Sequence, residues 1–252
     1  MNQPPAVPAP GLPAEILVDA VNVAKIYHLG RIEAQALRGV SLQVRQGDFL
    51  TIVGPSGSGK TTFLNLIGAL DTPSAGTLKL FGRDLATLSK AARADLRLRS
   101  LGFVFQAYNL VPVLTARENV EFVLELQGLG AERRSRAQTV LEQLGLGEFA
   151  DRRPNELSVG QQQRVAVARA VASRPRLVLA DEPTANLDGE NAELLIDLMR
   201  NLNRQEGTTF IFSTHDPRVV RRAGRIVRLE DGRVTADEPG SAAAPAARPQ
   251  DA

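Results

Sequence analysis

The chain has 252 residues, of which 43% are hydrophobic and 23% charged, a composition that supports one large domain with a sizeable core. The 30 Lys and Arg residues against 28 Asp and Glu give a formal net charge of +2, too small for a broad nucleic-acid-binding face. The sequence contains no cysteine, which excludes disulfides and thiolate chemistry, whether as zinc ligands or as a nucleophile.

Both ends of the chain are predicted to be disordered tails. Residues 1–13 are rich in Pro and Ala and residues 237–252 in Ala, Pro and Gly, and neither segment has apolar periodicity. The N-terminus lacks the basic and apolar regions of a signal peptide, and no apolar run approaches the ~20 residues of a membrane span. We therefore expect a cytoplasmic chain with an ordered domain over residues 14–236, and a membrane role only through a partner.

The predicted strands follow in chain order. The first two, Ile16–Val23 and Leu37–Val44, alternate like half-buried antiparallel strands. Phe49–Val53 is a nearly continuous apolar run, which is typical of a parallel strand covered on both faces. A hairpin turn at Asp231-Gly232 leads into a last short strand. The other buried-type strands are expected at Leu101–Phe105, Leu177–Ala180, Thr209–Ser213 and Ile226–Leu229.

Helical stretches fall between these strands, and two begin with clear capping signals. Thr115-x-x-Glu118 is a capping box, and Asp216-Pro217 is an N-cap followed by Pro at the first helical position. Strands followed by helices predict an α/β fold with a mostly parallel sheet and helices on both faces. The interval from about 110 to 172 contains helices only, which indicates an inserted helical sub-domain. The helices are expected at Lys60–Gly68, Thr115–Leu129, Ala131–Leu144, Ser158–Ala172, Gly189–Gln205 and Pro217–Arg222.

A glycine-rich loop lies between the third predicted strand and the first helix. Its sequence from Gly54 to Thr61 matches the phosphate loop G-x-x-x-x-G-K-[ST], and the strand and helix on either side disfavour a ligand-free turn. The glycines let backbone N–H groups face phosphate oxygens, and the helix adds its positive N-terminal end. We expect Lys60 to reach the β- and γ-phosphates and the Thr61 hydroxyl to bind Mg²⁺. The predicted nucleotide-binding residues of this loop are Gly54, Pro55, Ser56, Gly57, Ser58, Gly59, Lys60, Thr61 and Thr62.

A second apolar strand, Leu177–Ala180, ends in the two acids Asp181 and Glu182. Carboxylates at the end of a buried strand are costly without a cation or a proton to handle. We expect Asp181 to hold Mg²⁺, usually through a water, and Glu182 to polarise the attacking water. An Asp that merely caps the next turn is the alternative, and the phosphate loop upstream disfavours it.

Ser158-Val-Gly-Gln161 opens a predicted helix, and its Ser-x-x-Gln spacing taken alone is explained by a capping box. Its surroundings change that interpretation, because the stretch Asn155–Ala170 lies just before the acidic strand. Here the sequence resembles the ATP-binding cassette (ABC) ATPases and their signature motif, and the resemblance covers about residues 16–233. It implies a P-loop NTPase core with a mostly parallel sheet, an N-terminal antiparallel β sub-domain and an inserted α-helical sub-domain.

The resemblance also assigns roles that patterns alone leave open. It implies that Tyr27 stacks on adenine, although a tyrosine at a strand edge is otherwise unremarkable in function. Gln106 matches the Q-loop, which senses Mg²⁺ and the attacking water, and Asp188 matches the D-loop, which crosses to a second subunit. His215 matches the switch histidine at the γ-phosphate, where a core or capping histidine is otherwise expected. The resemblance thus implies catalysis by Glu182, His215, Gln106 and Lys60, metal binding by Thr61, Gln106 and Asp181, and nucleotide binding across the dimer by Ser158, Gly160 and Gln161.

One position of the signature departs from the family's usual Leu-Ser-Gly-Gly-Gln, because Val159 replaces the first glycine. Gly160 keeps the position where the backbone comes closest to the γ-phosphate, and Ser158 is present. Every other catalytic position is intact. We therefore expect ATP hydrolysis at an altered rate rather than an inactive nucleotide-binding subunit.

Two further segments, residues 63–77 and 108–120, look like the lipoprotein-release, macrolide-export and cell-division branch of the ABC ATPases. The resemblance implies a homodimer around two ATP molecules that drives a separate membrane permease at the inner face of the cell membrane. The alternative, a soluble ABC ATPase acting on ribosomes or nucleic acid, usually carries two cassettes or an inserted coiled coil, and neither is visible here. A regulatory switch without turnover is disfavoured by the intact Glu182 and His215. We expect no nucleic-acid partner.

Overall fold

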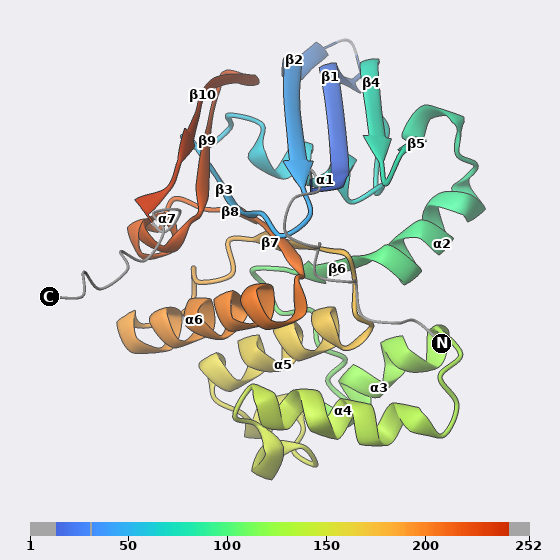
Figure 1. The fold of residues 1–252 in the computed structure, drawn as a ribbon, viewed down its shortest axis with the longest axis vertical. Helices are drawn as coiled ribbons and strands as arrows, with labels where there is room; N and C mark the ends of the chain where they lie inside the picture. The colour runs from blue at the N-terminus through green and yellow to red at the C-terminus, as the bar shows by residue number, and fades with distance from the viewer. Residues whose placement is uncertain (1–13, 31, 242–252) are drawn as a thin grey trace, which may run out of the picture.

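The computed structural model describes residues 14–30 and 32–241, so the predicted N-terminal tail lies outside the described residues. Two sheets dominate this part of the chain (Figure 1). One is a four-stranded antiparallel sheet and the other a six-stranded, mostly parallel sheet. The fold class predicted from the sequence is therefore correct.

The antiparallel sheet has the strand order β2-β1-β4-β5. The two predicted N-terminal strands are present but longer, as β1 (Ile16–Leu29) and β2 (Ile32–Arg45). The sequence analysis missed β4 (Ala75–Leu80) and β5 (Arg83–Asp84). β4 begins with Ala-Gly and holds only two buried residues, so its sequence has no strong strand pattern. It forms a strand because it pairs with β1.

The six-stranded sheet has the order β10-β9-β3-β8-β7-β6. Neighbours from β9 to β6 run parallel, and only β10 is antiparallel to its neighbour. Consequently the carboxyl ends of β3, β7 and β8 meet at one edge, where functional loops of α/β proteins gather. The strands are β3 (Phe49–Val53), β6 (Leu101–Val104), β7 (Leu177–Asp181), β8 (Thr209–Ser213), β9 (Arg225–Glu230) and β10 (Arg233–Pro239).

The last strand corrects the predicted C-terminal boundary. β10 continues through residues 237–239, and the backbone N–H of Gly240 donates to Gly224 O at 2.9 Å. The Arg225 guanidinium binds the Asp237 carboxylate at 2.6 Å, which fixes the strand end to its neighbour. The prediction of a domain ending at 236 and a disordered tail from 237 is therefore wrong for residues 237–241, because composition carries no sign of these cross-strand contacts. Residues 242–252 lie outside the described residues.

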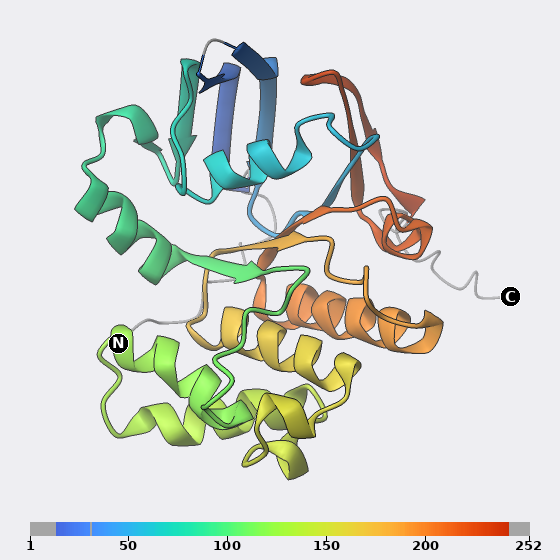
Figure 2. The same ribbon diagram turned by 180° about the vertical axis from the view of Figure 1, so that it is seen from behind.

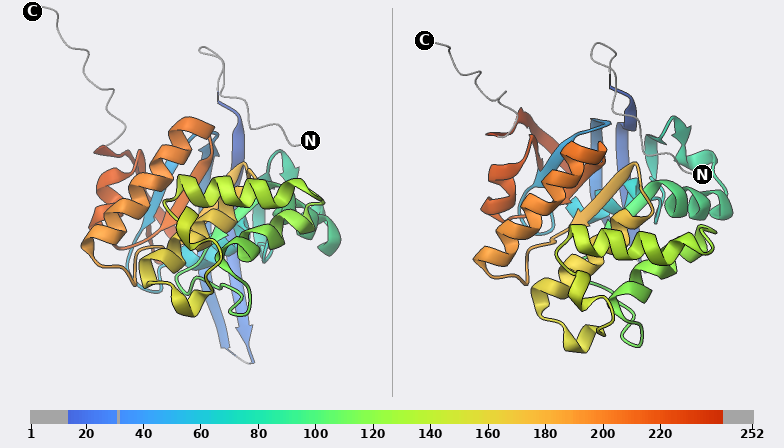
Figure 3. Two further views of the ribbon diagram at one scale, coloured as in Figure 1. Left: turned by 90° about the horizontal axis from the view of Figure 1, so that it is seen from below. Right: turned by 60° about the horizontal axis from the view of Figure 1, so that its bottom comes forward.

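Helices cover both faces of the six-stranded sheet. α1 lies between the two sheets, where its buried face shares one core with β1, β2 and β3 (Figure 2). α3, α4 and α5 pack against one another on the other side, with α6 beside α5 (Figure 3). The main helices are α1 (Lys60–Ile67), α2 (Lys90–Ser100), α3 (Ala116–Leu126), α4 (Glu132–Gln143), α5 (Val159–Ala172), α6 (Gly189–Glu206) and α7 (Pro217–Arg222).

The sequence analysis also missed α2. Its eleven residues bury a single side chain, Leu96, so no apolar stripe marks the helix. Ser89 caps its first turn, and the Arg97 guanidinium donates to Ala69 O at 2.7 Å, which ties the helix to the loop after α1. Across the part of the chain that the structure describes, no helix combines the length and apolarity needed to cross a bilayer.

Candidate functional site

The ends of three parallel strands create a cavity at one edge of the six-stranded sheet. Ile52 of β3 and Asp181 of β7 both pair with Ser213, the last residue of β8. The loops that leave these strands face a cavity of about 600 Å³. The residues that line it are Ala36, Gly54, Pro55, Ser56, Gly57, Gly59, Lys60, Thr61, Thr62, Gln106, Glu182, Ala185, Ser213 and His215.

The glycine loop can bend as it does only because side chains are absent at two positions. A Cβ at Gly54 would lie 2.0 Å from Leu229 O, and one at Gly59 would lie 2.6 Å from Ala36 O. Gly59 also caps α1 in the left-handed region with φ 101°. The Lys60 ammonium donates to the carbonyl oxygens of Gly54 and Pro55 at 2.8 and 2.9 Å, which holds it above the loop. This arrangement is a cradle for an anion, because backbone N–H groups, a helix N-terminus and an ammonium share it.

A hydroxyl of the cavity lining contacts a carboxylate that is not itself among the lining residues. Thr61 Oγ1 at the start of α1 lies 3.2 Å from Asp181 Oδ2 at the end of β7. Oxygen donors of this kind are the ligands that Mg²⁺ prefers, usually together with waters and substrate phosphates. The residues present therefore fit a magnesium ion held beside a bound polyphosphate.

Glu182 is held in an uncommon conformation. Its φ is 47°, which a non-glycine residue adopts at a cost and which clusters at functional sites. Its backbone N–H donates to Ser213 O at 2.8 Å. Its two carboxylate oxygens contact different partners, His215 Nδ1 at 2.8 Å and the Thr214 hydroxyl at 3.1 Å. The side chain is therefore fixed at the cavity wall with its direction set by two neighbours.

The contacts behind Glu182 form a second layer that the sequence analysis overlooked. Thr214 Oγ1 accepts from the backbone N–H of Asp216 at 3.0 Å while donating to Glu182. Asp216 in turn accepts from the Thr184 hydroxyl at 2.8 Å and from the Arg218 guanidinium. Burial raises the pKa of Asp216, but hydrogen bonds from Arg218 and Thr184 outweigh it, and the net shift is downward. The position of Thr214, directly before His215 and after a predicted strand, was the available signal.

Gln106 reaches the cavity from the loop after β6. The Asn186 side-chain amide donates to the Gln106 carbonyl at 3.1 Å, which joins this loop to the segment after Glu182. The Arg169 guanidinium of α5 donates to the carbonyls of Tyr108 and Asn109, residues with φ of 58° and 50°. The loop therefore has direct hydrogen bonds both to the cavity wall and to the signature helix.

The signature residues do not line this cavity. Ser158 Oγ accepts from the Gln161 backbone N–H at 3.3 Å, and Gln161 Oε1 accepts from the Ser158 N–H at 2.8 Å, a reciprocal cap of α5. Gly160 is buried, and a Cβ there would lie 2.7 Å from Asn191 Oδ1. Asn191 in turn donates to Asp188, and these hydrogen bonds lower the pKa of that carboxyl. The signature and the predicted D-loop are thus neighbours.

Tyr27 also lies outside the residues that line the cavity. Its hydroxyl donates to Asp71 Oδ2 at 3.3 Å, and the Lys25 ammonium lies 5.0 Å from the centre of its ring. Lys25 and Asp71 form an ion pair at 2.7 Å, so these contacts join β1 to the end of the α1 segment. Stacking of Tyr27 on an adenine remains a prediction.

The cavity is built from a strand, a glycine loop and a helix that begins with Lys60 and Thr61. A neighbouring strand ends next to it in Asp181 and Glu182. This arrangement defines a P-loop nucleotide-binding protein. Comparison with protein families is more specific. The ABC transporter family model matches residues 37–185, and the chain belongs to this family.

Named relatives place the chain in one branch of the family. It is 46% identical to the lipoprotein-releasing system ATP-binding protein LolD 1 of Caulobacter vibrioides over 89% of this chain and 97% of that protein. It is 47% identical to the macrolide export ATP-binding/permease protein MacB of Syntrophobacter fumaroxidans over 86% of this chain, but it spans only 31% of that protein. The resemblance to the lipoprotein-release and macrolide-export branch is therefore confirmed.

A solved structure supports the same assignment. The dimeric post-hydrolysis state of the ATP-binding cassette MJ0796, bound to ADP and Pi, matches with a TM-score of 0.82 and 44% identity, over 88% of this chain and 98% of that one. The ABC ATPase fold with its antiparallel β sub-domain is confirmed, as is the assignment of the chain as an ATP-binding ATPase of this class. The comparisons give no support to the alternative of a ribosome- or nucleic-acid-directed ATPase.

Proposed function

We propose that two copies of this chain enclose two ATP molecules, with the cavity of each copy closed by Ser158, Gly160 and Gln161 of the other. The observation that carries the proposal is the separation of these residues from the cavity of their own chain, although both sets of motifs are present. A single set of motifs can complete a site only across a two-fold interface. The N-terminus of α5, with its cap already formed, would offer backbone N–H groups to a γ-phosphate.

The predicted residues in and around the cavity have separable roles in hydrolysis. The Lys60 ammonium leaves the Gly54 and Pro55 carbonyls to bind the β- and γ-phosphates. Thr61, Asp181 and Gln106 would hold Mg²⁺, which neutralises phosphate charge. Glu182 orients the attacking water and accepts its proton, while His215 holds Glu182 and contacts the γ-phosphate. Tyr27 stacks on the adenine, and Asp188 contributes to the dimer interface.

The second part of the proposal is a membrane permease as partner. A groove of about 480 Å³ opens between α2, α3 and the loop that carries Gln106. Its walls are mainly apolar, with Leu70 and Leu126 50% and 57% exposed and with Phe103 and Phe105 stacked at 5.8 Å. An exposed apolar groove of this kind fits an amphipathic helix. A cytoplasmic helix of the permease in this groove would place the chain at the inner face of the cell membrane.

Substitution of the proposed general base tests the dimer. Glu182→Gln keeps the shape of the side chain but cannot accept a proton, so we expect an ATP-bound dimer that persists in light scattering, with turnover lowered roughly 100-fold or more. Glu190→Gln, in the first turn of α6, is the matched control and should stay active. A Glu182→Gln protein that remains monomeric with saturating ATP and Mg²⁺ would falsify the proposed dimer.

Co-purification tests the membrane partner. The tagged chain is expressed in its native cell, the membranes are solubilised in mild detergent, and bound proteins are identified by mass spectrometry. A permease with few spans and a large extracytoplasmic domain is the expected result. A permease with many spans would keep the transport function and change the type of transporter. Ribosomal or nucleic-acid partners without a membrane protein would contradict the proposal.

A further inference from the structure

The apolar groove continues into a charged cleft beside α4. The cleft has a volume of about 420 Å³ and shares Ser173 with the groove. The two are also joined through neighbouring residues, since Leu98 and Leu126 line the groove and the residues that follow each of them line the cleft. The residues that line the cleft are Arg99, Gln127, Gly128, Leu129, Glu132, Arg136, Ser173 and Arg174.

Positive charge dominates this cleft, with three arginines against Glu132 as the acid among its lining residues. Arg99 is compensated by Asp95, whose carboxylate lies 2.7 Å from its Nε. Among the described residues, the arginines of the cleft without an ion pair are therefore Arg136 of α4 and Arg174 after α5. A second cavity, of about 370 Å³, extends the cleft past these two arginines toward Glu206.

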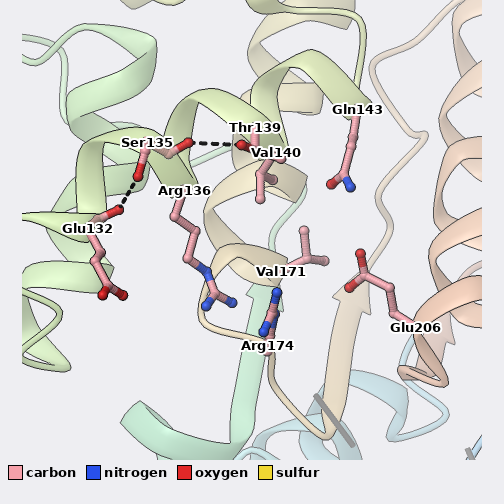
Figure 4. Close-up of a pocket in the computed structure, with 9 residues that line it drawn as sticks. All are labelled: Glu132, Ser135, Arg136, Thr139, Val140, Gln143, Val171, Arg174 and Glu206. Carbon is pink, nitrogen blue, oxygen red and sulfur yellow. Dashed lines mark hydrogen bonds between the residues drawn. The ribbon is translucent and has the colours of Figure 1, made fainter. Parts of the chain in front are cut away.

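Arg136 and Arg174 converge from different elements. Their guanidinium groups point toward one another (Figure 4), and within the described residues neither side chain makes a hydrogen bond or an ion pair. Burial and the charge of Arg174 both lower the pKa of Arg136, whereas the charges of Glu206 and Glu132 raise it. Arg136 is partly buried and Arg174 is exposed. A carboxylate between the two facing guanidinium groups would offset their repulsion through charge-assisted hydrogen bonds.

We infer that Arg136 and Arg174 recognise an acidic side chain of the same permease segment whose apolar face occupies the groove. The inference rests on the proposed function and deepens it, because it names the chemistry that selects the partner. Continuity of the groove with the cleft supports a single occupant that spans both. Charge complementarity requires Asp or Glu at the end of that segment that lies nearest α4.

Charge reversal tests this inference in the full chain. Arg136→Glu combined with Arg174→Glu should lower recovery of the co-purified permease by about tenfold or more at equal salt. Arg134→Glu combined with Arg204→Glu is the matched control, since both residues are exposed and outside the two cavities, and it should recover the permease normally. Basal ATP turnover and the thermal midpoint of both variants show whether they are folded.

Cross-linking then locates the occupant, because the chain has no cysteine and an introduced one is unique. A photoreactive group on Glu132→Cys should attach to a permease segment that contains Asp or Glu, and the same group on Arg134→Cys should not. Reversal of that acid to Lys should restore binding to the variant with both Arg136→Glu and Arg174→Glu.

Three results would overturn the inference while leaving the proposed function intact. These are normal permease recovery by the double reversal, cross-links to a permease segment without acids, and cross-links to lipid alone. If the unaltered chain recovers no membrane protein, the proposed membrane role fails and the inference fails with it.

Discussion

The phosphate cavity and the signature segment are both rich in catalytic motifs, yet they differ in how complete they are. In the cavity, the loops after three strand ends bring Lys60, Glu182 and His215 together within one chain. The signature residues Ser158 and Gly160 instead begin a well-capped helix outside the cavity lining, and Gly160 lies against Asn191. One region is assembled by folding within one chain, whereas in the proposed dimer the other reaches the nucleotide from a second copy.

This difference has a functional consequence. A cavity that binds nucleotide in the monomer but lacks part of its wall can couple ATP binding to dimer formation. In the proposed dimer, hydrolysis removes the γ-phosphate between the two regions, which allows the dimer to open. Variants of the two regions should therefore fail in different assays.

The largest effect is expected in the cavity. Lys60→Ala removes the ammonium held above the glycine loop, and nucleotide binding by the monomer should weaken roughly 100-fold. Titration with a fluorescent ATP analogue measures this, with Lys90→Ala in α2 as the control. Unchanged affinity would show that the backbone N–H groups alone hold the phosphates.

A substitution in the signature should lower ATP turnover and leave ATP binding by the monomer nearly unchanged. Ser158→Arg places a long side chain at the N-terminus of α5, so ATP affinity of the monomer should stay within about twofold while steady-state phosphate release falls about 100-fold. Mixing this variant with Lys60→Ala sharpens the comparison. In the mixed dimer one site combines the intact cavity of one chain with the intact signature of the other, and part of the activity should return. No recovery on mixing would contradict sites shared between copies.

A smaller effect on turnover is expected from Thr214, which contacts the proposed general base Glu182. Thr214→Val removes the hydroxyl that contacts Glu182 Oε2 at 3.1 Å, so kcat should fall by about three- to tenfold with KM unchanged. Thr214→Ser keeps the hydroxyl and should restore most of the rate. Steady-state kinetics distinguishes this role from a structural one, since loss of folding would lower the active fraction of both variants alike.

The smallest effect concerns stability. Asp216→Asn keeps the cap of α7 but loses the charge that binds Arg218, and at pH 7 it should cost about 1 kcal/mol in the free energy of unfolding. Because folding lowers the pKa of Asp216, its stabilisation is present above the unfolded pKa of about 3.9 and is lost as pH falls through the folded pKa. Urea unfolding should therefore show the difference from the unaltered protein shrinking below about pH 4. A constant difference across that range would contradict the assigned cause.

The sequence predicted helices and strands best where a local pattern, such as an apolar run or a helix cap, marks them. The apolar runs of β3 and β8 and the caps of α3 and α5 are all found in the structure. It failed where elements depend on contacts from distant segments. α2 buries only Leu96, and β10 continues through Asp237 because it pairs with β9 and contacts Arg225.

The sequence by itself determined the chemistry of this protein, because a phosphate loop needs glycines followed by Lys60 and Thr61 in one continuous stretch. It also determined the acids at the end of β7, since charge after a buried strand demands a partner. Only the tertiary structure decided which motifs lie next to one another. It places Glu182 against Thr214 and His215, and Gly160 of the signature against Asn191. The reason is geometric: spacing along the chain fixes neighbours within a turn or a strand, whereas sheet order and helix packing fix which loops meet.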